Sequence, residues 1–145
     1  MTSTSRSCPG KLPAESGAMK GRCVLVLDDS ELALEVQVMM LERQGFVVRG
    51  CLDLDDVASA ADDFSPDAVL TDVDLGDVSI EQACRALRES FGDDVPILLL
   101  SGRPEDELEQ LAEELDVDGW VSKSERQDDL LAKLEGAIHL ADSGL

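Results

Sequence analysis

The chain has 145 residues, 43% of them apolar, which is enough to bury one sizeable core but not two. Asp and Glu outnumber Lys and Arg by 32 to 12, and the resulting formal charge of -20 would repel DNA, RNA and anionic lipid. We therefore expect one domain that binds neither nucleic acid nor membrane.

The first 20 residues mix Ser, Thr, Pro and Gly without apolar periodicity, so residues 1–20 are expected to be a flexible extension. No apolar run there suits a signal peptide and none elsewhere suits a membrane span, so a cytoplasmic location is the default expectation. Cys8, Cys23, Cys51 and Cys84 lie far apart without a neighbouring His. We interpret them as reduced thiols and not as zinc ligands.

From Arg22 onward, short apolar runs alternate with amphipathic stretches. The runs are apolar at successive positions, as strands covered on both faces must be. The five predicted strands are residues 23–27, 46–49, 68–71, 95–100 and 119–121.

The stretches between the strands begin with helix-starting residues. The predicted helix starts are Ser30, Asp53, Ser79, Pro104 and Ser124. Ser79 and Ser124 each precede a Gln by three residues, which is the spacing of a capping box. Three acidic residues follow Pro104 and face the positive end of the helix dipole. The first helix should stop at Gly45 and the second before Pro66.

Five strand–helix units predict an α/β fold with a doubly wound, five-stranded parallel sheet, (βα)5. The flavodoxin-like strand order 2-1-3-4-5 would place the first and third strands side by side at the centre. We expect this domain to cover residues 21–141 and a short tail to cover 142–145.

Reactive groups of open α/β sheets collect beyond the carboxyl ends of the strands. Asp28 and Asp29 follow the first predicted strand, Asp72 the third and Ser101 the fourth, and Lys123 comes just after the fifth. Any one of them alone would be an ordinary turn or solvated residue. Their combined placement at four of five strand ends predicts a site.

Three carboxylates in one pocket repel one another unless one is protonated or a cation is bound. Mg²⁺, a hard ion that prefers oxygen, suits such a site better than Zn²⁺ or Ca²⁺. Asp72 could then act as a nucleophile and form an acyl phosphate. Lys123 and the Ser101 hydroxyl could hold the remaining phosphoryl oxygens.

These residues, with the segment of residues 72–77, resemble the receiver domain of bacterial two-component response regulators. The resemblance extends over roughly residues 21–141. It implies that Ser101 hydrogen-bonds the phosphoryl group and that Lys123 pairs with it. Two positions depart from the family: Ser124 replaces a common Pro, and Ile80 stands where a Gly is frequent.

The resemblance also implies that Asp72 is phosphorylated by a histidine kinase or a histidine phosphotransfer protein. Asp28, Asp29 and the backbone carbonyl of Asp74 would help to hold Mg²⁺. Trp120 falls where the family usually has a Tyr or Phe that swings inward on activation.

The first predicted helix has more apolar residues than one buried stripe needs. Ala33, Val36 and Met40 fall on one side, and Leu34 and Val38 project away from them. The resemblance implies that the first set faces the sheet. Leu34 and Val38 would then lie outward, available to dock a helical bundle that presents a phosphohistidine.

We expect a single-domain response regulator, not an enzyme, that signals through contacts with a downstream protein of unknown identity. An interaction module that has kept the fold but lost phosphorylation, a pseudo-receiver, is one alternative. A Mg²⁺-dependent phosphohydrolase of the haloacid dehalogenase type, suggested by Asp72-Val73-Asp74, is another. In that family the D-x-D motif follows the first strand, whereas here an acidic pair comes first.

Overall fold

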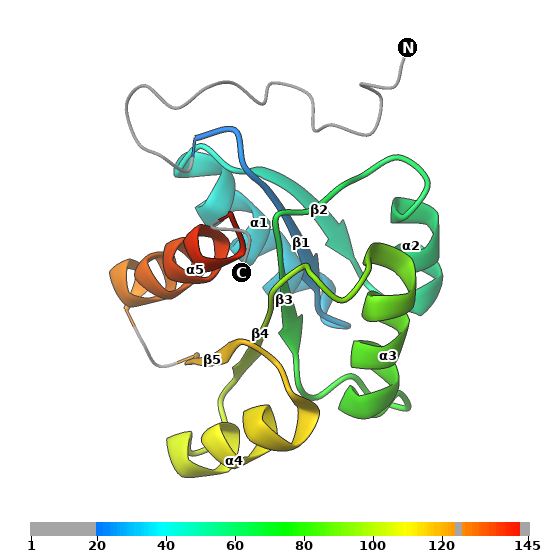
Figure 1. Cartoon of the computed structure of the whole chain (residues 1–145), viewed down its shortest axis with the longest axis vertical. Coiled ribbons are helices and arrows are strands. Elements are labelled where there is room, and N and C mark those ends of the chain that lie inside the picture. The colour runs from blue at the N-terminus through cyan, green and yellow to red at the C-terminus, as the bar shows by residue number, and fades with distance from the viewer. Residues whose placement is uncertain (1–19, 124–125, 143–145) are drawn as a thin grey trace.

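A computed structural model describes residues 20–123 and 126–142. Five strands alternate with five helices along this part of the chain (Figure 1). The elements are β1 (Cys23–Leu27), α1 (Glu31–Arg43), β2 (Val47–Cys51), α2 (Leu54–Ala60), β3 (Ala68–Asp72), α3 (Ile80–Phe91), β4 (Ile97–Ser101), α4 (Glu105–Leu115), β5 (Gly119–Ser122) and α5 (Gln127–Asp142).

The strands form one parallel sheet in the order β2-β1-β3-β4-β5, which confirms the predicted topology. Leu27 at the end of β1 pairs with Thr71 of β3, so the residues that follow each of them lie side by side. Asp72 pairs in turn with Leu100 of β4. The register therefore brings the ends of β1, β3 and β4 to one edge of the sheet.

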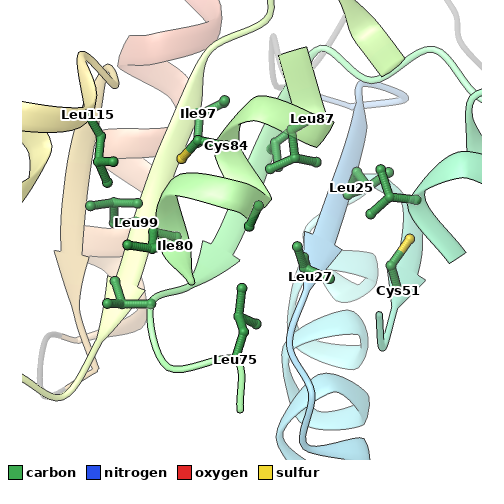
Figure 2. Close-up of a cluster of buried hydrophobic side chains, with 14 of the residues drawn as sticks. Leu25, Leu27, Cys51, Leu75, Ile80, Cys84, Leu87, Ile97, Leu99 and Leu115 are labelled. Carbon is green, nitrogen blue, oxygen red and sulfur yellow. The ribbon is translucent and has the colours of Figure 1, made fainter. Parts of the chain in front are cut away.

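Two helical layers cover the sheet. Figure 1 shows helices on both sides of the sheet. Side chains of α1 and α5 form a core with one face, and those of α2, α3 and α4 form a core with the other. Figure 2 shows the second core, in which Ile80, Cys84 and Leu87 of α3 point toward the strands. Along β1, alternate residues belong to opposite cores, which is why the strand is apolar throughout.

The predicted helix starts are confirmed where the structure describes them. Ser30, Asp53 and Ser79 accept backbone hydrogen bonds as N-caps of α1, α2 and α3. Ser79 and Gln82 form a complete capping box. Pro104 occupies the N-cap of α4, where it provides no side-chain hydrogen bond. The capping box predicted at Ser124 lies outside the described residues, as do residues 1–19 of the expected N-terminal extension.

The predicted orientation of α1 is wrong. Leu34 is 9% exposed and packs into the core with Leu41 and the partly buried Val38, whereas Val36 is 59% exposed. The three inward residues have the i, i+4, i+7 spacing of one helical stripe. Gly50 of β2 makes room for this stripe, because a Cβ there would lie 3.2 Å from a methyl carbon of Leu34. Leu34 and Val38 are therefore core residues and unavailable for docking.

The cysteines in the described part of the chain divide into two groups, and Cys8 lies outside that part. Cys51 and Cys84 are free and buried, as expected for reduced thiols. Burial raises the pKa of Cys51 to about 12, so this group stays protonated at neutral pH. Cys23 is disulfide-bonded, so the expectation is wrong at this position. Pairing depends on the distance between Cα atoms in the fold, which sequence spacing does not reveal.

None of the helices in the described part of the chain combines the length and apolarity that a bilayer span requires.

Candidate functional site

The carboxylates of Asp28, Asp29 and Asp72 meet at the carboxyl edge of the sheet. Their ligand oxygens all lie within 4.8 Å of one another. Asp28 is completely buried and Asp72 nearly so, whereas Asp29 is exposed. The adjacency of β1 and β3 creates this cluster, as the sequence predicted. Such a set of oxygen donors fits a hard divalent cation, because the cation offsets the repulsion of closely spaced carboxylates.

Two hydrogen bonds fix the carboxylate of Asp28. Its Oδ1 accepts from the backbone N–H of Ser30 at 3.0 Å, and its Oδ2 accepts from Nε2 of Gln37 at 2.9 Å. Gln37 was not predicted from the sequence. The sequence feature that could have identified it is its position two helical turns after the N-cap Ser30, which places its amide on the same side of α1.

Asp72 is held by a backbone amide and a cation. The N–H of Asp74 donates to Oδ1 at 3.1 Å, and Nζ of Lys123 lies 3.4 Å from Oδ2. Lys123 also lies 3.9 Å from Oδ2 of Asp28. Burial raises the pKa of Asp72 above its ordinary value, although the Asp74 amide and Lys123 oppose this rise. The negative charge of Asp28 adds to it.

Ser101 lies at the end of β4 and is completely buried. Its Oγ accepts from the backbone N–H of Arg103 at 3.0 Å, so its hydroxyl hydrogen can still serve a second acceptor. Its carbonyl accepts from the N–H of Lys123 at 2.8 Å. These contacts join the loops after β4 and β5 into one rim of the site.

The loop after β3 also borders the site. Gly76 has a φ of +68°, and a Cβ at this position would lie 3.2 Å from Oδ2 of Asp29. Glycine therefore suits both the left-handed backbone and the close approach of the carboxylate. The side chain of Asp74 points to the rim, where its Oδ1 lies 2.6 Å from a guanidinium nitrogen of Arg103.

Trp120 lies on β5, three residues before Lys123, and is half-buried against the core shared with α3 and α4. The Nζ of Lys133 from α5 lies 4.2 Å from the ring centroid and donates to the Trp120 carbonyl at 3.1 Å. A cation over an indole face is attractive.

Ile80, where the family often has a Gly, is buried in the first turn of α3.

The fold and the site together define a doubly wound α/β protein with a carboxylate cluster at the carboxyl edge of its central strands. Residues 24–135 match the family described as response regulator receiver domain. The chain belongs to this family. Receiver domains are signalling domains of two-component systems, in which histidine kinases supply the phosphoryl group and an acidic cluster binds Mg²⁺.

Similar proteins agree with this assignment. The response regulator GraR of Staphylococcus aureus is 34% identical over 112 residues, covering 77% of this chain and 49% of GraR. The phosphate regulon transcriptional regulatory protein PhoB of Pseudomonas aeruginosa is 28% identical over 130 residues, covering 87% of this chain and 56% of PhoB. The chain thus spans about half the length of these curated relatives.

Among solved structures, the chemotaxis protein CheY4 of Vibrio cholerae has the same fold. Its TM-score is 0.71 at 24% identity, and the match covers 81% of this chain and 98% of CheY4. The likeness supports the flavodoxin-like architecture with the strand order that the sheet shows.

Proposed function

We propose that this chain is a phosphorylation-operated switch: Asp72 accepts a phosphoryl group from a histidine kinase or a histidine phosphotransfer protein in a Mg²⁺-dependent reaction. One observation carries the proposal. The nearly buried carboxylate of Asp72 lies 3.4 Å from Nζ of Lys123 and within the cluster formed with Asp28 and Asp29.

In this reaction a carboxylate oxygen of Asp72 attacks the phosphorus, and the P–N bond of the phosphohistidine breaks. The electron pair of that bond leaves with the imidazole. Lys123 and the Ser101 hydroxyl bind phosphoryl oxygens as their negative charge shifts during transfer. The Asp74 amide holds the carboxylate in position.

Mg²⁺ would be held by the carboxylates of Asp28, Asp29 and Asp72 and by the backbone carbonyl of Asp74. When bound, it supplies positive charge that screens the phosphoryl group from the attacking carboxylate. The proposal for the first three ligands is supported by the spacing of their oxygens, all within 4.8 Å of one another.

The site borders a groove between α1 and α5, and we assign kinase docking to this groove in place of Leu34 and Val38. Its volume is about 510 Å³. Leu32, Val36 and Met40 of α1 line it, opposite Leu130 of α5 and beside Lys123. Leu32 is 73% exposed. An apolar groove next to the phosphoacceptor suits a helix of the bundle that presents the phosphohistidine.

The role of Trp120 as a switch stays a proposal. Its half-buried ring has Lys133 on one face, and a movement on phosphorylation would disturb this contact. Because Trp120 is the single Trp of the chain, its fluorescence should change on phosphorylation of the wild type and not of Asp72→Asn. Identical spectra would leave it a packing residue.

The output is proposed to be a contact with another protein, and a cytoplasmic location stays a prediction. Family membership removes the support for a phosphohydrolase of the haloacid dehalogenase type. The pseudo-receiver remains the alternative that experiment must distinguish, because the same fold and side chains are compatible with low reactivity.

Incubation with a small acyl-phosphate donor and Mg²⁺, followed by intact mass spectrometry, tests the proposal. We expect one phosphoryl group on the wild type, none on Asp72→Asn, and none when Mg²⁺ is removed. Absence of labelling in the wild type would favour the pseudo-receiver. Equal labelling of Asp72→Asn would show that the acceptor lies elsewhere.

A further inference from the structure

Arg103 lies on the rim of the site, in the loop between β4 and α4. Its backbone N–H donates to Oγ of Ser101 at 3.0 Å, and its guanidinium lies 2.6 Å from Oδ1 of Asp74. The backbone N–H of Asp74 in turn donates to Asp72. The side chain of Arg103 is thus connected to the phosphoacceptor through one residue, Asp74, and its main chain contacts Ser101 at the end of β4.

Positive charge is scarce in this chain, which has 12 Lys and Arg against 32 Asp and Glu. Lys123 is paired with Asp72, and the guanidinium of Arg103 is paired with Asp74, two residues further along the chain. Arg103 has no role in the proposed phosphoryl transfer and was not predicted from the sequence.

The Arg103–Asp74 pair is a weak contact. The two side chains are 42% and 61% exposed, and solvent-exposed ion pairs contribute little to stability. A phosphoryl group carries about two negative charges and three acceptor oxygens. A guanidinium binds such a group through two parallel hydrogen bonds, a geometry for which it is better suited than an ammonium.

We propose that Arg103 is a phosphoryl-binding residue that exchanges Asp74 for the phosphoryl oxygens when Asp72 is phosphorylated. This inference rests on the proposed function. Before phosphorylation, Asp74 holds the guanidinium at the rim and competes for it. After phosphorylation, the higher charge of the phosphoryl group outcompetes Asp74, and Arg103 becomes the second cation on that group beside Lys123.

The exchange would link phosphorylation of Asp72 to the position of the loop before α4. The Arg103 amide stays on Ser101 while its side chain turns inward, so residues 101–104 are drawn toward the phosphoryl group. These residues lead directly into α4, whose N-cap Pro104 provides no side-chain hydrogen bond to hold that end. The beginning of α4 thus lacks the side-chain cap that α1, α2 and α3 have.

The test is the affinity of the whole chain for beryllium fluoride, a phosphoryl mimic, measured by calorimetry at saturating Mg²⁺. Arg103→Ala should weaken binding about tenfold, the effect expected from losing one charge-assisted contact. Asp74→Asn should strengthen it a few-fold, because the competing carboxylate is gone while the backbone amide and carbonyl remain. Arg103→Lys should retain part of the affinity. Arg85→Ala, an exposed change on α3 with the same loss of charge, should match the wild type.

Opposite effects of Arg103→Ala and Asp74→Asn distinguish competition from a structural ion pair, whose loss from either side would weaken binding alike. The inference is overturned if Arg103→Ala binds as Arg85→Ala does, or if Asp74→Asn does not bind more tightly. If the wild type still binds beryllium fluoride, either of these results would leave the proposed function intact. No binding by the wild type, together with no labelling at Asp72, would overturn both.

Discussion

The carboxyl group of Asp72 occupies a site that is unfavourable for its ionised form. Burial and the nearby charge of Asp28 raise the pKa of its carboxyl group. A carboxyl pKa that is higher in the folded state lowers stability progressively as the pH rises from the unfolded-state value, about 3.9, through the folded-state value. Without metal, the ionised form of Asp72 is therefore less favourable in the folded chain than in the unfolded chain.

Asp72→Asn should remove this cost and raise the melting temperature of the metal-free protein by several degrees at pH 7. A change of about 1 kcal/mol shifts the melting temperature of a domain of this size by roughly 4 °C. The difference from wild type should shrink as the pH falls toward 4, and Mg²⁺ should stabilise the wild type more than the variant. Thermal melts in chelator and in Mg²⁺ measure both effects.

The matched control is Asp62→Asn, which removes an exposed carboxylate beyond the end of α2. It should leave the melting temperature almost unchanged. A lower melting temperature for metal-free Asp72→Asn would contradict the account, because it would mean that the ionised group stabilises the fold.

Gln37 is expected to orient a metal ligand. Its Nε2 donates to Oδ2 of Asp28 at 2.9 Å, and groups that orient ligands typically change metal affinity 10- to 100-fold. Gln37→Ala should therefore weaken Mg²⁺ binding by about tenfold in a calorimetric titration. Gln110→Ala, on the exposed side of α4, is the control and should bind Mg²⁺ as the wild type does. Equal affinities in all three proteins would show that Asp28 needs no such support.

At the scale of elements, α1 shows what a sequence pattern leaves open. Its apolar residues are compatible with two different buried stripes. The observed stripe of Leu34, Val38 and Leu41 is as regularly spaced as the inward set predicted from the sequence. A contact that favours the observed stripe is that of Leu34 with Gly50 of β2, where the absence of a side chain leaves room for it. That contact joins residues distant in sequence, so helical periodicity could not have predicted it.

The exposed stripe of α1 leads to a prediction about the kinase. Leu32→Lys and Val36→Lys place a charge in the proposed docking groove without touching the acidic cluster. Each should lower the rate of transfer from the cognate histidine kinase several-fold and leave labelling by a small acyl-phosphate donor unchanged. Radiolabel transfer assays compare the two reactions.

Leu140→Lys is the control, since Leu140 is 71% exposed near the other end of α5 and does not line the groove. It should support normal transfer from the kinase. Slower labelling of the Leu32→Lys variant by the small donor would show damage to the site itself, and unchanged kinase transfer in both groove variants would rule out the docking role.

At the scale of the whole molecule, the sequence predicted the features that depend on chain order. Five apolar runs predicted the parallel sheet, and the polar residues at or just beyond the ends of β1, β3, β4 and β5 predicted the group that meets at its edge. The structure brings Asp28, Asp29, Asp72, Ser101 and Lys123 to that edge. Gln37 and Arg103 escaped prediction because their roles depend on side-chain directions across elements, and Cys23 because its pairing depends on distance in the folded chain.

The location of the phosphoryl group tests the central claim most directly. The wild type would be incubated with a small acyl-phosphate donor and Mg²⁺, treated with borohydride, which reduces an acyl phosphate to an alcohol, and then digested for tandem mass spectrometry. The account predicts a reduced side chain at Asp72 and at none of the other Asp and Glu residues among the 32. Reduction at a different carboxylate, or none in a sample that the donor has demonstrably labelled, would contradict it.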